Sequence, residues 1–392
     1  MPDVHDVTVT PAVLEWARKT IGWSRPQAAA RLDLPTSRLS GLETGASRPT
    51  WGELRKMAKA YHRPPAVLLL STPPEEPPLP RYFRTLDNEP VSAETLSSET
   101  LLAIRRARHI RNLVLNLEGN RSAERAALPR ATLSQDPGET ARLVSKTLGV
   151  IEPGINPRFA DERDAIRKWR QILYGGGILA LQLPIPVDEA RGFSIPDDAF
   201  PVIVASQHDS PKARVFTLFH ELGHLVLRNP GICEISFRSS KDPGNRVERF
   251  CNAFAGRILV PDNSLESAVG RLRVEDPTNE RSVEKLSAHF CVSQEVVLRR
   301  MLDTRRLSLD DYRDRTEALR AGYSERPRPS VSGGPDYVRL RFNEYGPEFA
   351  KLVLNSVDNG RLTFRDAVDF LGLKVDHLVR VREFIDRDSE RG

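Results

Sequence analysis

The sequence predicts a multidomain protein with an all-α N-terminal domain, an α+β central domain and a helical C-terminal domain. Length gives the first indication, because 392 residues exceed the usual size of one domain. Two compositional breaks give the second: residues 71–80 hold five prolines, and residues 321–335 are rich in Pro, Gly and Ser. Periodicity gives the third, since strand-like runs at 177–183 and 201–206 lie among helical runs in the middle of the chain.

These features divide the chain into segments. We expect an N-terminal domain at 1–70, a Pro-rich linker at 71–91, a helical connector at 92–150, a central domain at 151–320, a linker at 321–336 and a C-terminal domain at 337–392. No run approaches the roughly 18 apolar residues of a membrane helix, and the N-terminus lacks a secretion signal. We therefore expect a cytoplasmic protein without a membrane partner.

The cysteines and the net charge narrow the class further. Cys233, Cys251 and Cys291 are scattered and never form a CxxC pair, so they imply neither a disulfide framework nor a cysteine-based zinc site. The net charge of +5 permits a nucleic-acid partner without requiring one.

Local signals in the first segment predict two helices that cross at a tight turn. Ser24 and Gln27 form a capping box at the start of the first helix. Asp33 ends that helix, because Asp tolerates the left-handed conformation that such a turn requires. Thr36 begins the second helix and Gly45 closes it. This spacing is typical of a helix-turn-helix.

The pattern resembles the XRE/Cro family of DNA-binding domains over about residues 10–65. The resemblance implies that the second helix lies in the major groove of double-stranded DNA, and that the protein works as a homodimer. The residues placed toward bases or phosphates by this likeness are Ser24, Thr36, Ser37, Arg38, Gly41 and Arg48. Residues 1–70 contain ten Lys or Arg against six Asp or Glu, a net charge of +4 that suits DNA. The alternative is a helical bundle for protein docking or dimerisation.

The helix expected at residues 214–227 carries the most informative motif, His220, Glu221 and His224. Residues four apart lie on one helix face, so two imidazoles can share one tetrahedral Zn²⁺. Glu221 lies beside them, where its carboxylate can take a proton from an activated water. The alternative is a pair of core histidines satisfied by hydrogen bonds.

A catalytic zinc site usually has three protein ligands. The helical stretch that follows residue 245 offers Glu248 as the leading third ligand, with Cys251 as a competing ligand and a more distant acid as a further alternative. Asn252, one turn after Glu248, could hydrogen-bond this carboxylate or the substrate.

The motif and its flanks resemble the ImmA/IrrE family of zinc metallopeptidases over about residues 165–310. The resemblance implies a minimal thermolysin-like, gluzincin-type fold in which His220, His224 and Glu248 bind Zn²⁺ and Glu221 is the general base. It also implies that the strand at 201–206 lies beside the site, where an edge strand aligns the substrate peptide. Family members typically cleave a DNA-bound repressor, and fusion to an XRE-type domain is common among them.

Several features leave alternatives open. The donor that would stabilise the oxyanion is not identified, and the candidates are His289, Tyr174 and Arg191. The helix-turn-helix spacing recurs at 287–297 and at 368–378, where we expect packing or partner-docking units rather than DNA binding. A basic run could bind phosphate or form a solvated helix face; it comprises Arg105, Arg106, Arg108 and Arg111.

The sequence thus favours a DNA-binding zinc endopeptidase that cleaves a repressor- or antitoxin-like protein to control transcription. Two other functions stay open. One is an XRE-type regulator whose metal domain is sensory or inactive. The other is an antitoxin-like adaptor that holds a partner through its C-terminal domain.

Overall fold

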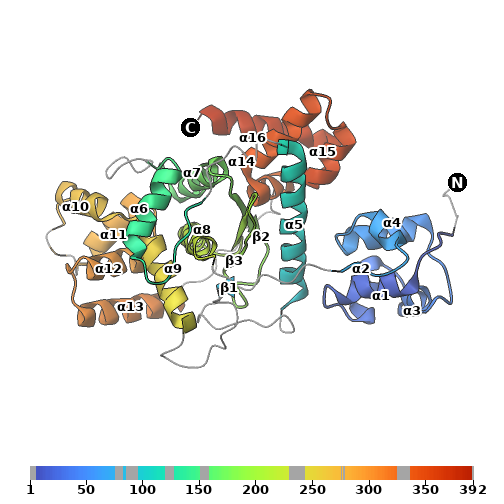
Figure 1. Cartoon of the computed structure of the whole chain (residues 1–392), viewed down its shortest axis with the longest axis horizontal. Helices are drawn as coiled ribbons and strands as arrows, with labels where there is room; N and C mark the ends of the chain where they lie inside the picture. The colour runs from blue at the N-terminus through green and yellow to red at the C-terminus, as the bar shows by residue number, and fades with distance from the viewer. Residues whose placement is uncertain are drawn as a thin grey trace.

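The computed structural model describes residues 6–75, 83–84, 96–119, 128–150, 159–228, 243–274, 276, 279–324 and 336–390. A small helical unit stands beside a central sheet that helices cover on both faces (Figure 1). Cys233 and most of the two expected linkers lie outside the described residues. Within the described part of the chain, no helix is long and apolar enough to cross a membrane.

The N-terminal unit is helical, as predicted. Its helices are α1 (Pro11–Lys19), α2 (Arg25–Leu32), α3 (Thr36–Thr44), α4 (Trp51–Ala60) and the 3-10 helix η1 (Pro65–Leu69). The predicted capping box is confirmed, because Ser24 and Gln27 each accept a hydrogen bond from the other's backbone N–H. Asp33 and Gly45 adopt left-handed conformations with φ of 54° and 81°, and they end α2 and α3. The two helices therefore cross at the expected turn.

The central sheet has the strand order β1-β3-β4-β2 over the described residues. Its strands are β1 (Phe83–Arg84), β2 (Leu179–Leu183), β3 (Gly192–Ile195) and β4 (Val202–Ser206). β4 runs parallel to β2 and antiparallel to β3, and β1 runs antiparallel to β3. The expectation that residues 201–206 form an edge strand is wrong, because the backbone of β4 is paired on both sides.

One face of the sheet carries the helices of the predicted metal domain. Helix α8 (Pro211–Val226) packs on β3 and β4, and α9 (Pro243–Leu259) crosses α8 (Figure 1). The surrounding helices are α6 (Pro137–Thr147), α7 (Glu162–Gly175), α10 (Asp262–Arg271), α11 (Glu280–Phe290), α12 (Gln294–Asp303) and α13 (Leu309–Ser324). Phe219 and Phe254 are fully buried in this core, and each contributes roughly 1.5–3 kcal/mol.

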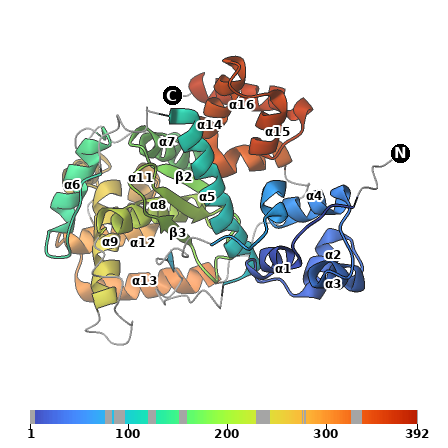
Figure 2. The same cartoon turned by 45° about the vertical axis from the view of Figure 1, so that its right-hand side comes forward.

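The other face of the sheet is covered by helices from both flanks of that domain. Helices α5 (Ser98–Glu118) and α14 (Tyr337–Asp358) lie on the strands, and α15 (Phe364–Leu371) and α16 (Leu378–Glu390) pack against α14, joined by the 3-10 helix η4 (Val375–His377). Leu181, Phe193 and Val204 of the sheet share one hydrophobic core with Phe349 of α14. The C-terminal helices therefore belong to the body of the protein, beside α5 (Figure 2).

The basic run on α5 forms neither a phosphate site nor a solvated helix face, and that expectation is corrected. Arg105 donates to the backbone oxygen of Tyr61 at 2.6 Å and to the hydroxyl of Thr20 at 2.9 Å, which ties the N-terminal unit to α5. Arg106 forms an ion pair of 2.5 Å with buried Glu344 of α14. The remaining members are half-buried, and Arg111 donates to the backbone oxygens of residues 199 and 200. Through these arginines, helix α5 contacts the N-terminal unit, α14 and the segment before β4.

The two later helix pairs have the local structure that their spacing predicts. Cys291 ends α11 in the left-handed conformation, and the Ser293 side chain caps α12. Gly372 ends α15 in the same conformation, and Thr363 forms a capping box at its start. Apolar residues of both pairs belong to the two large cores, as expected of packing units.

Candidate metal centre

Helix α8 brings two histidines together inside an apolar environment. The Ser210 side chain caps the helix, with Pro211 at its first position, where a missing N–H costs no hydrogen bond. His220 and His224 follow in the last two turns, and they are 0% and 6% exposed. Their Nε2 atoms lie 3.2 Å apart. Two unprotonated imidazole nitrogens at this distance would repel each other, so the pair requires a proton or a cation between them.

Glu248 reaches the same point from α9. Its Oε2 lies 3.2 Å from Nε2 of His220, and its Oε1 lies 3.3 Å from Nε2 of His224. The corners of a tetrahedron around zinc, with metal–ligand distances of 2.0–2.1 Å, are about 3.3 Å apart. All three side chains offer ligand atoms within 4.8 Å of one another. The donor types and their spacing therefore fit a Zn²⁺ ion.

Asn252 and Cys251 lie behind the two imidazoles. The Oδ1 atom of Asn252 lies 2.9 Å from Nδ1 of His220, so a hydrogen bond from Nδ1–H leaves Nε2 free to bind a metal. Cys251 is fully buried, and its thiol interacts with His224 outside the group of three converging donors. The arrangement thus favours Glu248 over Cys251 as the third ligand.

The charged groups of the centre shift one another's pKa values. Burial opposes protonation of His224, but Cys251 and Glu248 outweigh it and raise the pKa of this imidazole well above its ordinary value. Burial likewise opposes ionisation of Glu248, but both histidines hold the pKa of its carboxyl far below the ordinary range. The centre therefore combines an ionised carboxylate with an imidazole that binds a proton strongly, and a metal ion must displace that proton.

Glu221 occupies a different environment one residue along α8. It is fully buried, and burial raises the pKa of its carboxyl, while His224, His220 and the Ser194 hydroxyl of β3 act in the opposite direction. Neither carboxylate oxygen satisfies the geometry of a full hydrogen bond with any described residue. A buried carboxyl with a raised pKa and unused acceptor capacity is suited to exchange a proton with a substrate or a water.

Two glycines allow the close packing on which this geometry depends, and sequence reasoning did not single them out. A Cβ at Gly223 of α8 would lie 3.0 Å from Sγ of Cys251 and 3.1 Å from its Cα. A Cβ at Gly192 of β3 would lie 2.4 Å from Cγ2 of Thr217 and 2.4 Å from the backbone oxygen of Val204. The available signal for Gly223 was an isolated glycine inside a helical pattern, which often marks close approach.

The three candidates for oxyanion stabilisation differ in their surroundings. The Tyr174 hydroxyl donates to Glu118 of α5 at 2.6 Å. Arg191 forms an ion pair of 3.3 Å with Asp209, and His289 is exposed on α11. These positions lend no support to any of the three, and the oxyanion donor stays unassigned.

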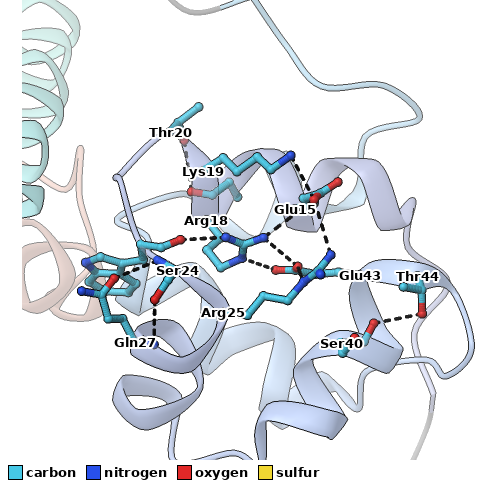
Figure 3. Close-up of polar contacts among 12 residues, drawn as sticks. Glu15, Arg18, Lys19, Thr20, Ser24, Arg25, Gln27, Ser40, Glu43 and Thr44 are labelled. Carbon is cyan, nitrogen blue, oxygen red and sulfur yellow. Dashed lines mark hydrogen bonds and ion pairs between the residues drawn. The ribbon is translucent and has the colours of Figure 1, made fainter. Parts of the chain in front are cut away.

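In the N-terminal unit, a buried ion-pair network holds α3 against α1 and α2. Arg18 of α1 donates to both carboxylate oxygens of Glu43 at 2.6 and 2.9 Å, and Arg25 of α2 donates to the same carboxylate at 2.8 Å (Figure 3). Because the Glu43 side chain is fully buried, removing a partner would leave charge uncompensated in the core. The network fixes the position of α3 relative to α1 and α2. The sequence patterns did not predict these ion pairs.

The predicted DNA-contacting residues divide into two groups. The exposed group contains Ser24 at the start of α2, Thr36 and Ser37 at the start of α3, and Arg48 in the turn after α3. The start of the second helix is the part that usually meets base edges in this kind of domain. Thr36 and Ser37 are therefore accessible to a DNA groove.

Arg38 and Gly41 instead face the chain itself. Arg38 donates to both carboxylate oxygens of Glu53 at 3.0 and 2.9 Å, and to the backbone oxygen of Arg48 at 2.9 Å. A side chain at Gly41 would meet the Ser47 hydroxyl at 2.9 Å. The contacts of these two residues support the turn after α3 rather than an open surface.

A helix-turn-helix unit joined to a buried HExxH helix with a converging glutamate defines a class of protein, a DNA-binding regulator with a metallopeptidase-type domain. Family models match both parts. Residues 12–70 match a helix-turn-helix domain, and residues 176–302 match Peptidase_M78, the IrrE N-terminal-like domain. The resemblance expected from the sequence is confirmed: the first stretch is similar to helix-turn-helix domains, and the second is similar to IrrE-like peptidase domains.

The match to a solved structure is partial. The chain is similar to a Mycobacterium tuberculosis transcriptional regulator, with 18% identity and a TM-score of 0.29. The similarity covers 50% of this chain and 51% of the other, so this chain spans about half of that protein's length. We found no significant match among curated proteins. The assignment therefore rests on the two family models.

Proposed function

We propose that this protein is a zinc-dependent endopeptidase tethered to double-stranded DNA, which cleaves a repressor- or antitoxin-like protein and thereby controls transcription. The observation that carries the proposal is the convergence of three donors at tetrahedral spacing, 3.2 to 3.3 Å apart, beside a buried glutamate. In this proposal His220, His224 and Glu248 hold the zinc, and Asn252 orients His220.

The chain's own residues account for the movement of the proton. A Zn²⁺ ion held at this centre would supply a Lewis acid that polarises the scissile carbonyl and acidifies the attacking water. Glu221 accepts the proton of that water, because its oxygens lack a full hydrogen-bond partner among the described residues. It then delivers the proton to the leaving amine nitrogen as the C–N bond breaks. Ser194 favours the ionised form of Glu221 from the side of β3.

In this proposal, the N-terminal unit binds DNA and thereby places the peptidase near the operator. Thr36 and Ser37 are exposed at the start of α3, where they can meet base edges, and the unit carries most of the net positive charge. Binding near the operator would raise the local concentration of a substrate that binds the same DNA. The same placement would be available to a homodimer on paired half-sites.

Metal content and one conservative variant test the proposal. Elemental analysis should find one zinc per native chain, with loss in both His224→Ala and Glu248→Ala. Glu221→Gln should keep the zinc yet lower peptide hydrolysis by roughly 10²–10⁴-fold. Glu266→Gln is the matched control, because Glu266 is exposed on α10. Equal hydrolysis by the native chain and Glu221→Gln would contradict the assignment of Glu221.

A metal-dependent regulator without peptidase activity is the second candidate function. Tyr174 and Arg191 contact Glu118 and Asp209, so the observed contacts of these two candidates do not assign either of them as an oxyanion donor. A transcriptional reporter separates the two functions. A response that needs His224 but is unchanged by Glu221→Gln would select the non-proteolytic regulator.

A further inference from the structure

The outer edge of β3 already carries a strand from the chain itself. β1 pairs antiparallel with β3, with Phe83 opposite Phe193 and Arg84 opposite Gly192. The backbone oxygen of Arg191 accepts a hydrogen bond from the Ser206 N–H of β4. Since backbone groups alternate sides along a strand, those of Gly192 and Ser194 point away from β4 and toward β1. The groups that could bind another strand therefore face β1.

The face of β3 next to this edge packs against the helix that carries the candidate metal centre. Gly192 lies against Thr217 of α8, one turn before His220. The Ser194 hydroxyl faces Glu221, so the side of β3 that carries Ser194 also faces the proposed general base. An extended peptide paired with the outer edge of β3 would pass beside Glu221.

We infer that β1 is an internal occupant of the edge where a substrate peptide would pair, and that a substrate strand binds only after β1 leaves. This inference rests on the proposed function and adds a mode of regulation to it. An edge strand has one row of unpaired N–H and C=O groups, so it cannot pair with β1 and a substrate strand at once.

The position of β1 in the chain explains how a substrate strand could replace it on β3. β1 lies between the N-terminal unit and α5, and Arg105 ties that unit to α5. Over the described part of the chain, two residues of β1 pair with β3, and a pairing of this length is weak by itself. Displacement of β1 would remove this pairing from the outer edge of β3.

Arg84→Pro tests the inference, because proline has no N–H to donate to the backbone of Gly192. Glu75→Pro is the matched control in the same connector, outside the paired residues. Hydrogen exchange is measured on the zinc-loaded full chain. The amide of Gly192 should exchange at least tenfold faster in Arg84→Pro than in the native chain and Glu75→Pro. The Val204 amide of β4 should be unaffected and reports that the fold is retained.

A peptide-binding measurement supplies a second readout. A labelled peptide with the sequence of residues 79–88, LPRYFRTLDN, should bind Arg84→Pro at least fivefold more tightly than the native chain. If Arg84→Pro unfolds, replacement of residues 81–86 by Gly and Ser serves instead. Unchanged exchange at Gly192 with equal peptide binding in all variants would overturn the inference.

Hydrolysis distinguishes this inference from the proposed function. A faster cleavage of unfolded casein by Arg84→Pro supports both. Faster exchange and tighter peptide binding without cleavage by any variant would support the occupied edge and contradict the peptidase. Cleavage that is equal in the native chain and Arg84→Pro, with unchanged exchange, would support the peptidase and contradict the occupied edge.

Discussion

Substitution of Gly223 by alanine is expected to weaken metal binding without altering any donor atom. The added Cβ would lie 3.0, 3.1 and 3.2 Å from Sγ, Cα and Cβ of Cys251 on α9. Ordinary contacts between such atoms are about 3.5–4.0 Å, so α8 and α9 must separate by roughly half an ångström. His220 and His224 lie on α8 and Glu248 on α9, so the separation acts on the distances between the donors.

The expected loss of zinc affinity depends on how large a change in zinc–ligand distance the site tolerates. Zinc–ligand distances vary by about 0.2 Å, which is less than the expected separation. We expect zinc affinity to fall about 10–100-fold, the range found when groups that support metal ligands are changed, which equals about 1.4–2.7 kcal/mol. Overpacking of the metal-free core by about 1–3 kcal/mol is offset by about 1 kcal/mol, because alanine is a better helix former than glycine.

Competition with a chromophoric zinc chelator measures this effect, and thermal unfolding of the metal-free chain measures the packing term. Gly270→Ala is the matched control, because Gly270 lies in α10 with no atom within 4 Å of the added Cβ. The control should keep native zinc affinity and gain up to about 1 kcal/mol of stability. Native zinc affinity in a folded Gly223→Ala chain would refute the argument that α8–α9 packing sets the ligand spacing.

Three further predictions concern contacts between helices, within the N-terminal unit and elsewhere. Arg105→Ala should loosen the N-terminal unit by about 1–2 kcal/mol and speed proteolysis between residues 70 and 97, because the partly buried backbone oxygens of Tyr61 and Thr20 lose this donor; an unchanged digestion rate would contradict this role. Arg38 lowers the pKa of Glu53 below 4.5, so the pair stabilises the folded unit above that pH and the stabilisation is lost as pH falls through the lower folded value. Glu53→Gln should remove this acid-dependent part of the melting curve, and a persistent acid transition of equal size would assign it elsewhere. Gly346 forms a kink inside α14, where its φ is +82°. Gly346→Ala should lower the free energy of unfolding in urea by about 1–3 kcal/mol, because the added Cβ would lie 2.7 Å from the Arg170 guanidinium. Native stability of this variant would contradict the need for glycine at the kink.

Features encoded by neighbouring residues were predictable from the sequence. The capping box of Ser24 and Gln27, and the left-handed Asp33, depend on groups at most three residues away, so the helix-turn-helix could be located from its own residues. The HExxH spacing likewise depends only on the period of one helix. These signals are local because a helix satisfies its hydrogen bonds within a few residues.

Features that depend on distant partners were not predictable in the same way. The pairing of Arg84 with Gly192 joins segments more than a hundred residues apart, and neither strand has a long alternating pattern. Charge alone placed Arg105 on a solvated face or against phosphate, although its partners lie on α1 and α4. Gly223 could be seen as unusual for a helix, but its partner Cys251 could not be known. A single sequence does not show which segments far apart in the chain will contact each other.

The shared core between the sheet and α14 has a consequence for synthesis of the protein. The sheet is complete in sequence at residue 206, whereas α14 ends at residue 358, about 150 residues later. At translation rates of about 5–20 residues per second, the face formed by Leu181, Phe193 and Val204 lacks this cover for roughly 10–30 seconds. A nascent chain in that interval exposes an apolar surface that chaperones recognise. The order of the chain thus delays completion of this core until α14 has been synthesised.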